Sequence, residues 1–147
     1  MRWITLALVY ASLAFLSTGC YTMSTLRFGN GTAADVKVKS SQTGQEIEIA
    51  PGRFKKLPHA AGDIIVTTKA GEKFKFTSIE PPRVDTDSTG TNYLDKRSSL
   101  FGPGYITLGL KLGTNMELFA LMPGKKSVDT KIPQPSGYPK RGEKMAD

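Results

Sequence analysis

Apolar and polar residues alternate along much of the chain after residue 20, a pattern that is typical of half-buried β-strands. Val36 and Val38 alternate with charged residues, and Ile47 and Ile49 do the same beyond the turn sequence at 41–44. A hairpin that pairs Val38 with Ile47 and Val36 with Ile49 also sets lysines opposite glutamates on the other face. A shift of one residue would break both sets of contacts, so this register is predicted.

The same pattern predicts a second hairpin farther along the chain. Ile64 and Val66 face Phe76 and Phe74 if residues 69–71 form the loop. The last residue of that loop is a glycine, which takes a left-handed backbone conformation without steric cost. Both observations support a hairpin at this place.

A third hairpin is predicted between residues 105 and 122, with its loop at 113–115. Its apolar pairs would be Ile106 with Met122, Leu108 with Ala120, Leu110 with Leu118 and Leu112 with Met116. An earlier strand is expected around Leu26 and Phe28, and a short one at 54–57. No stretch after residue 20 shows a sustained helical period, so we expect an all-β fold of about seven strands. This would be a small antiparallel β-sandwich, immunoglobulin-like or transthyretin-like, or an open barrel.

The 147 residues divide into three parts by composition. Residues 1–19 form an export signal, 20–122 a β-sandwich domain, and 123–147 a basic, proline-rich tail that we expect to be flexible. Within the domain, 21–79 is β-rich, 80–104 is a long polar loop, and 105–122 is the third hairpin.

The first segment has the three parts of a signal peptide. Arg2 supplies a positive start, residues 3–16 are almost all apolar, and the small residues Ser17, Thr18 and Gly19 precede Cys20. The apolar run is shorter than the ~20 residues that a membrane-spanning helix needs. The sequence therefore predicts removal of this segment rather than a transmembrane helix.

Residues 16–20, Leu-Ser-Thr-Gly-Cys, resemble the lipobox of bacterial lipoproteins, in which Gly or Ala precedes an obligatory Cys. The resemblance covers residues 1–20. It implies cleavage between Gly19 and Cys20, a diacylglyceryl group on the Cys20 thiol and an acyl chain on the new amine. No other cofactor is expected. Two or more acyl chains hold a protein stably on a membrane. Since Tyr21 is not the Asp that retains enteric lipoproteins in the inner membrane, the outer membrane, facing the periplasm, is the expected location.

The net charge of the chain suggests which kind of surface it binds. The formal net charge is +7, with 20 basic and 13 acidic residues. Because export separates the chain from nucleic acid, acidic envelope surfaces are the more suitable partners. In the tail, Lys125, Lys126, Lys140 and Arg141 are candidates for contact with anionic lipid or cell-wall polymer. A solvated tail without a partner is the alternative.

Few residues offer catalytic or metal-binding chemistry. His59 is the sole histidine and lies in a turn-like sequence, so we expect it to be exposed in a loop rather than catalytic. The sole cysteine is Cys20, which precludes an internal disulfide and leaves only carboxylates as metal ligands. The run at 85–90 begins like a calcium-binding loop, but position 96, where that loop requires a glutamate, is a lysine. We therefore predict no metal site and no enzyme activity.

Loop 80–104 is longer than most connections in compact domains. It contains Tyr93, Arg97, Leu100 and Phe101, which are candidates for partner contact. The alternative is that these residues fold back over an open end of the sandwich.

These observations favour a non-enzymatic, membrane-anchored lipoprotein that acts as a structural or adaptor module in an envelope assembly. The first alternative is a lipoprotein that binds a small molecule or glycan between loops 80–104 and 58–62. A hydrolase that uses His59 and a phage-encoded envelope lipoprotein are further alternatives.

Overall fold

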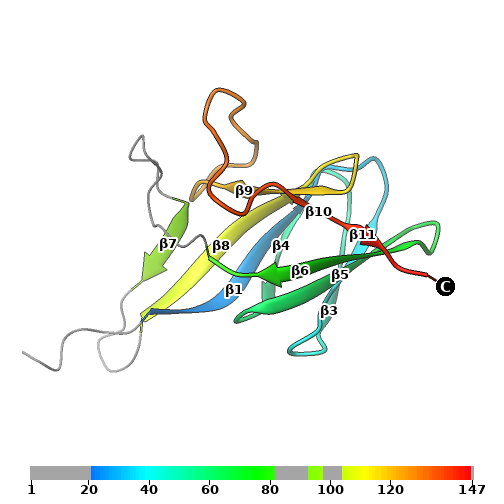
Figure 1. The fold of residues 1–147 in the computed structure, drawn as a ribbon, viewed down its shortest axis with the longest axis horizontal. Helices are drawn as coiled ribbons and strands as arrows, with labels where there is room; N and C mark the ends of the chain where they lie inside the picture. Colours follow the sequence, from blue (N-terminus) through cyan, green and yellow to red (C-terminus); the bar gives the residue numbers. More distant parts are fainter. Residues whose placement is uncertain (1–20, 82–92, 98–103, 147) are drawn as a thin grey trace, which may run out of the picture.

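The computed structural model describes residues 21–81, 93–97 and 104–146, and it is all-β over these ranges. Figure 1 shows two sheets packed face to face. The strands are β1 Tyr21–Asn30, β2 Val36–Ser40, β3 Glu46–Ile49, β4 Phe54–Pro58, β5 Gly62–Thr68, β6 Lys73–Ile79, β7 Leu94–Arg97, β8 Gly104–Leu112, β9 Glu117–Leu121, β10 Lys140–Arg141 and β11 Glu143–Lys144.

The first sheet has the strand order β10-β9-β8-β1-β4, and β7 pairs with β8 beside β9. The second sheet has the order β11-β6-β5-β2-β3. All neighbours are antiparallel except β1 and β8, which run parallel. This one parallel pair departs from the expected antiparallel sandwich. It is possible because most of the domain separates the two strands in sequence, which allows the long crossover that parallel strands need.

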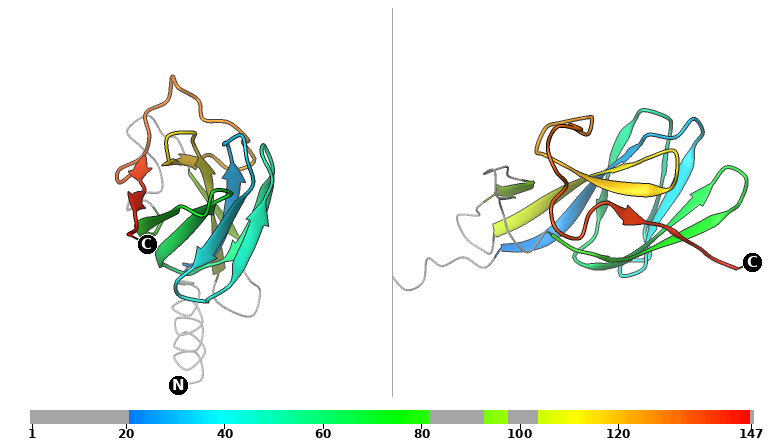
Figure 2. Two further views of the ribbon diagram at one scale, coloured as in Figure 1. Left: turned by 90° about the vertical axis from the view of Figure 1, so that its right-hand side faces the viewer. Right: turned by 45° about the horizontal axis from the view of Figure 1, so that its top comes forward.

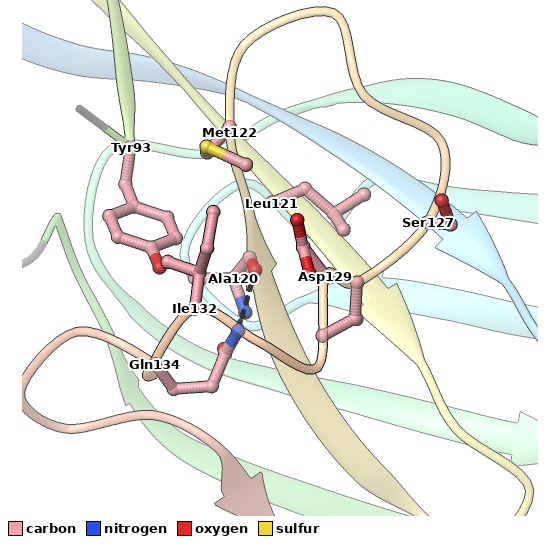
Figure 3. Close-up of a pocket in the computed structure, with 9 residues that line it drawn as sticks. Tyr93, Ala120, Leu121, Met122, Ser127, Asp129, Ile132 and Gln134 are labelled. Carbon is pink, nitrogen blue, oxygen red and sulfur yellow. Dashed lines mark hydrogen bonds between the residues drawn. The ribbon is translucent and has the colours of Figure 1, made fainter. Parts of the chain in front are cut away.

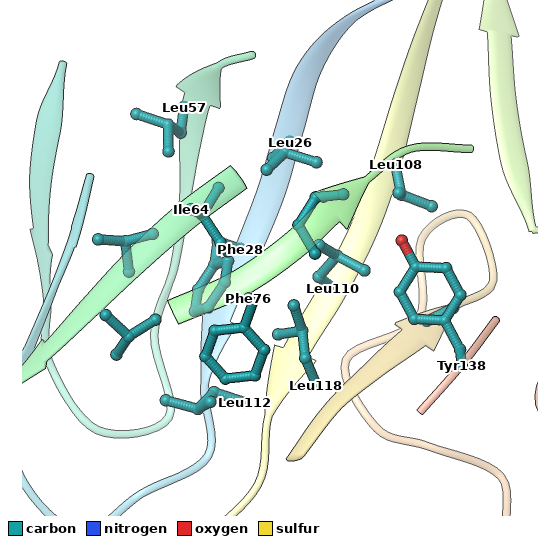
Figure 4. Packing of buried hydrophobic residues seen from close by; sticks show 14 of the residues in the cluster. Leu26, Phe28, Leu57, Ile64, Phe76, Leu108, Leu110, Leu112, Leu118 and Tyr138 are labelled. Atoms are coloured by element: carbon teal, nitrogen blue, oxygen red, sulfur yellow. The ribbon is translucent and has the colours of Figure 1, made fainter. Parts of the chain in front are cut away.

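Alternate residues of the strands point inward and form one core (Figure 4). Leu26 and Phe28 of β1 lie at its centre, with Ile64 of β5, Phe76 of β6 and Leu110 of β8, and all five are fully buried. The burial of β2 and β8 alternates residue by residue, as the sequence pattern predicts. The core between the sheets therefore follows directly from the period-2 pattern.

The structure confirms the first two predicted hairpins. Val38 pairs with Ile47 and Val36 with Ile49. In the second hairpin, Ile64 pairs with Phe76 and Val66 with Phe74.

The third hairpin forms, but its predicted register is wrong by two residues. Leu110 pairs with Ala120 and Leu112 with Leu118. The loop closes one residue later, because the N–H of Gly113 donates to Glu117 O at 2.7 Å and Met116 takes a φ of 57°. A shift of two residues leaves every side chain on its predicted face, so the apolar pattern accommodates both registers.

Asn30 ends β1 and is buried, with both ends of its side chain bonded. Its Nδ2 donates to the carbonyls of Ala34 at 2.7 Å and Ile49 at 2.9 Å. Its Oδ1 accepts from the N–H and the hydroxyl of Thr32 at 2.9 and 2.7 Å. These bonds hold the chain as it leaves the first sheet for the second.

The segment after Pro123 differs from the expected flexible tail, because residues 124–146 pack on the sandwich. The Gln134 amide lies along the edge of β9, where Oε1 accepts from Ala120 N at 2.8 Å and Nε2 donates to Ala120 O at 3.2 Å. The Tyr138 side chain is buried, and its hydroxyl donates to Glu80 O at 3.0 Å. Unpaired backbone groups at the edges of β9 and β6 explain the order, since this segment satisfies them.

We call residues 138–146 the C-terminal strap, because they cross from one sheet to the other. β10 pairs with β9 of the first sheet, and β11 pairs with β6 of the second. Gly142 stands between them and donates its N–H to Met116 O at 2.9 Å. Figure 2 shows the strap running along one side of the sandwich. Both sheets are thereby joined at this side.

No helix in the described part of the chain has the length and hydropathy needed to cross a bilayer.

Candidate functional site

The start of β1 lies directly after the predicted lipidation site. Gly19 and Cys20 fall outside the described residues, but Tyr21 is the first residue of β1 and pairs with Gly104 of β8. β7 ends at the same place, with Arg97 opposite Tyr105. In Figure 1 these strand ends form one extremity of the molecule, far from the C-terminus. We call this region the anchor end: Arg97, Gly104, Tyr105 and the start of β1.

The anchor end carries an exposed aromatic and an exposed cation. Tyr105 is 42% exposed, and no other large hydrophobic residue is exposed within 25–81, 93–97 and 104–146. Arg97, a predicted contact residue, has a side chain that is 64% exposed and lies 3.6 Å from the Asp95 carboxylate. Tyr105 was not predicted as a site residue, although its outward position follows from its alternation with Ile106. The predicted contacts Leu100 and Phe101 lie outside the described residues.

Tyr93, the fourth predicted contact residue of loop 80–104, belongs to the core. Its side chain is 3% exposed, and its hydroxyl donates to Pro133 O at 2.8 Å. It lines a cavity of about 10 Å³, which Figure 3 shows between β9 and the chain that follows it. The lining residues are Tyr93, Ala120, Leu121, Met122, Ser127, Val128, Asp129, Ile132 and Gln134. A cavity of this size has room for about one water molecule, so Tyr93 closes this side of the sandwich rather than presenting a contact surface.

The expectation that His59 is exposed is wrong. Its side chain is 1% exposed, and its Nδ1 lies 2.8 Å from the hydroxyl of Ser40, which is itself fully buried. Burial lowers the pKa of His59, and the nearby backbone of Ile79 and Gly62 and the charge of Asp63 oppose this only in part. The turn-like sequence around His59 is drawn against the end of β2, which local composition does not indicate.

Ser40, His59 and Asp63 contain the residue types of a catalytic triad but not its geometry. Asp63 uses Oδ1 to accept from the Ser78 N–H at 3.0 Å and Oδ2 to contact Lys75 Nζ at 2.9 Å. These two interactions lower the pKa of Asp63. Because Ser40 and His59 are both buried, a substrate would not reach the serine hydroxyl in this conformation.

The four predicted basic contacts occupy two separate elements. Lys125 and Lys126 have exposed side chains, while their carbonyls accept from Arg27 at 2.8 Å and Lys111 at 3.3 Å. In the C-terminal strap, Arg141 pairs with Glu117 at 3.2 Å. Lys140 Nζ lies 5.6 Å from the centre of the Tyr138 ring. The four cations therefore come from two segments, the turn after β9 and the C-terminal strap, and contact different partners.

Two shallow hollows are lined by residues of the second sheet, and one of them extends to β4 of the first sheet. One of about 320 Å³ is lined by Asp35, Lys37, Glu48, Thr67, Thr68, Lys69 and Gly71. The other, of about 280 Å³, shares Asp35 and Glu48 and adds Ala50, Arg53 and Lys55. Acidic and basic side chains alternate there and offset one another. Neither hollow is lined by residues 58–62 or by the described residues of loop 80–104, where the ligand-binding alternative expects its site.

Within 21–81, 93–97 and 104–146, no group of three or more His, Cys, Asp and Glu residues is placed to hold a metal ion. Comparisons with protein-family models, with curated proteins and with solved structures find no match.

Proposed function

We propose that this chain is a non-enzymatic lipoprotein, anchored through Cys20 in the outer membrane and facing the periplasm, where its β-sandwich serves as a structural or adaptor module. The observation that carries the proposal is the position of the lipobox-like sequence relative to the fold. The predicted cleavage point precedes Cys20, and β1 begins at Tyr21.

This position makes the predicted processing compatible with the folded domain. Cleavage before Cys20 would keep every described residue of β1, an interior strand that pairs with β8 and β4. Cleavage by an ordinary signal peptidase a few residues later would shorten this interior strand. The pairing of β1 from Tyr21 onward thus favours cleavage at the cysteine over cleavage after it.

The buried Ser40–His59 pair supports a non-enzymatic role. These residues and Asp63 supply the nucleophile, base and acid types that a hydrolase needs, yet their bonds connect β2, β5 and β6 and the turn before β5. We therefore assign them to the stability of the domain, and the anchor to its function.

The anchor is tested by expressing the full chain and the Cys20→Ser variant in a bacterial host with an outer membrane. We expect the wild-type protein to start at residue 20, to carry the mass of a diacylglyceryl group and an acyl chain, and to enter the detergent phase in phase separation. The variant should lack this mass and the detergent partitioning. Thr18→Ser, which keeps a small residue before the cleavage point, is the matched control. A wild-type protein with a lipid-free mass would contradict the proposal.

The adaptor role is tested separately, by chemical cross-linking in intact cells and purification from detergent-solubilised envelope. We expect the wild-type chain to co-purify with a reproducible envelope protein, and the Cys20→Ser variant to lose it. A lipidated chain that remains monomeric and partnerless would remove the adaptor role and leave the anchor intact.

A further inference from the structure

We propose that the anchor end rests in the phospholipid headgroup layer, with Tyr105 and Arg97 as its lipid contacts, so that the domain stands on the membrane in one orientation. This inference rests on the proposed lipidation of Cys20. It adds to it a surface that touches the membrane and a direction in which the rest of the molecule points.

The distance along the chain supports contact. Thr22 pairs with Tyr105 across the parallel strands β1 and β8. Consecutive Cα atoms are about 3.8 Å apart and neighbouring strands about 4.8 Å apart. The Cα atom of Tyr105 therefore lies within roughly 13 Å of that of Cys20. A lipid on Cys20 would hold Tyr105 close to the headgroup layer, because no flexible linker separates the cysteine from the folded strand.

Tyr105 has the chemistry of a membrane-interface residue. Its ring is 42% exposed at the anchor end, while its neighbour Ile106 points into the core. Tyrosine is enriched where a membrane meets water, because the apolar ring enters the interface and the hydroxyl stays hydrated. In water a large part of Tyr105 faces solvent, whereas on a membrane its ring would gain apolar surroundings.

Arg97 adds a phosphate-binding group directly opposite Tyr105. Its ion pair with Asp95 is long, at 3.6 Å, and both side chains are well exposed. Such surface pairs contribute little stability. A guanidinium binds phosphate through two parallel hydrogen bonds, so a lipid phosphate is a stronger partner for Arg97 than Asp95 is in water.

The fold then places the opposite extremity farthest from the bilayer. β8 runs from Gly104 at the anchor end to Leu112 near the loop at 114–116. Thr114 is exposed in that loop. A strand segment from Tyr105 to Thr114 spans about 30 Å. In this orientation Thr114 lies away from the bilayer, whereas the membrane covers the anchor end.

The sequence offers a clean probe of this orientation. The sole tryptophan is Trp3, which is lost with the predicted signal. The mature chain is then free of tryptophan, so Tyr105→Trp and Thr114→Trp each create a single reporter. Both lipidated variants are reconstituted into phosphatidylethanolamine–phosphatidylglycerol vesicles with and without brominated acyl chains. We expect the Tyr105→Trp variant to show blue-shifted emission and several-fold stronger quenching than the Thr114→Trp variant.

Two further variants test the reasons for that result. An insertion of eight Gly and Ser residues between Cys20 and Tyr21 gives the domain a tether of about 16 Å, and should reduce quenching at position 105 toward the level at 114. Arg97→Glu, combined with Tyr105→Trp, should reduce quenching as well, by repelling lipid phosphate.

The outcomes separate the two proposals. Vesicles that float with the protein but quench both reporters equally would overturn the orientation and leave the lipid anchor standing. A chain without lipid on Cys20 that fails to float would overturn both. Preferential quenching at position 105 that the inserted linker removes would support both.

Discussion

Burial favours the neutral form of His59. The Ser40 hydroxyl accepts from the Thr43 N–H at 3.3 Å and lies 2.8 Å from His59 Nδ1. Nε2 is buried and has no hydrogen-bond partner among the described residues. A second ring proton would bury a positive charge, which is why the folded state lowers the pKa of His59.

The lowered pKa of His59 predicts that the domain loses stability in acid. The unfolded chain binds a proton near pH 6.5, whereas the folded chain resists protonation to a lower pH because the ring is buried. The contribution is therefore complete above about pH 6.5 and falls as the pH drops below that value toward the lowered pKa. Urea unfolding of the domain at pH 7.5 and pH 5.0 measures it.

The matched variant for this measurement is His59→Phe, which cannot take a proton. It should be less stable at pH 7.5, by about 1–3 kcal/mol, because Ser40 is left buried without its partner. Between the two pH values it should lose less stability than the wild type. The carboxylate of Asp63, whose pKa is lowered below 3.8 by Ser78 and Lys75, does not titrate in this window. Equal losses in both proteins would contradict the assignment to His59.

Single residues were the hardest features to predict from the sequence. His59 lies between Pro58 and Ala60, and nothing local distinguishes a solvated turn from one that folds against Ser40, 19 residues away. Tyr93 likewise carries no local sign of its bond to Pro133. Burial of such residues depends on contacts between distant segments, which composition does not encode. Cys20 is the opposite case, because the motif that marks it is local.

Among the elements, the hairpins were predictable to the extent that both faces constrain them. The register of β2 and β3 is fixed by valine–isoleucine pairs on one face and lysine–glutamate pairs on the other. In β8 and β9 the inward residues are all apolar, so alternation determines the face but not the register. The turn between β8 and β9 determines their register, because Met116 takes a left-handed backbone conformation there. Residue propensities do not favour this conformation for a methionine.

The C-terminal strap was missed for a different reason. Its two strands contain two residues each, too short for any period to be visible. The prolines and lysines around them are typical of flexible segments. What orders the strap is the open edge of each sheet and the burial of Tyr138, and both appear only once the sandwich is assembled.

The strap can be tested by a single methyl group at Gly142. A Cβ atom there would lie 2.8 Å from Cζ of Phe76 and 3.2 Å from Cβ of Phe74. Gly142→Ala should therefore push the strap away from β6 and reduce the free energy of unfolding by about 1–3 kcal/mol. Urea unfolding measures the loss, and amide exchange at residues 142 and 145, whose N–H groups bond Met116 and Lys73, locates it.

Lys144→Ala is the matched control in the same element. It removes an exposed ion pair with Glu72 and leaves the backbone pairing in place. Its cost should be below about 1 kcal/mol. If residue 142 exchanged as fast as an unprotected amide in the wild type, the strap would not be part of the folded domain.

At the scale of the whole molecule, the two sheets are joined along both sides. On one side β3 passes into β4 through the tight turn at 50–53, where Arg53 N donates to Ala50 O at 3.1 Å. On the other side the strap passes from β10 to β11. A sheet edge attracts other strands, and proteins commonly cover or charge it. On the first side, β3 carries glutamates and β4 carries lysines, so these edges are charged. On the other side the strap covers the edges of β9 and β6.

Some features of the candidate site can be predicted from the local sequence, and others arise only from contacts in the folded domain. The lipobox-like sequence predicts an anchor without a structure, and Arg97 was predicted because it lies in a long loop. The pairing of Arg97 with Tyr105, and of Tyr105 with Thr22 two residues after the anchor, depends on the parallel contact of β1 and β8. No local pattern predicts a contact between strands more than 80 residues apart.

Removal of residues 138–147 is therefore expected to change both stability and association. It deletes the buried Tyr138 side chain, which contributes about 1.5–3 kcal/mol by analogy with other large side chains, and it exposes the edges of β9 and β6 together. We expect the truncated domain to unfold at lower urea concentration and to form dimers or larger species as its concentration rises, because two adjacent free edges can pair with those of another copy. Light scattering coupled to size-exclusion chromatography measures the association.

A chain that ends at Lys144 keeps both strap strands and should stay monomeric under the same conditions, which separates loss of the edge cover from mere shortening. A truncated domain that remained monomeric and as stable as the full chain would show that the strap covers edges that need no cover.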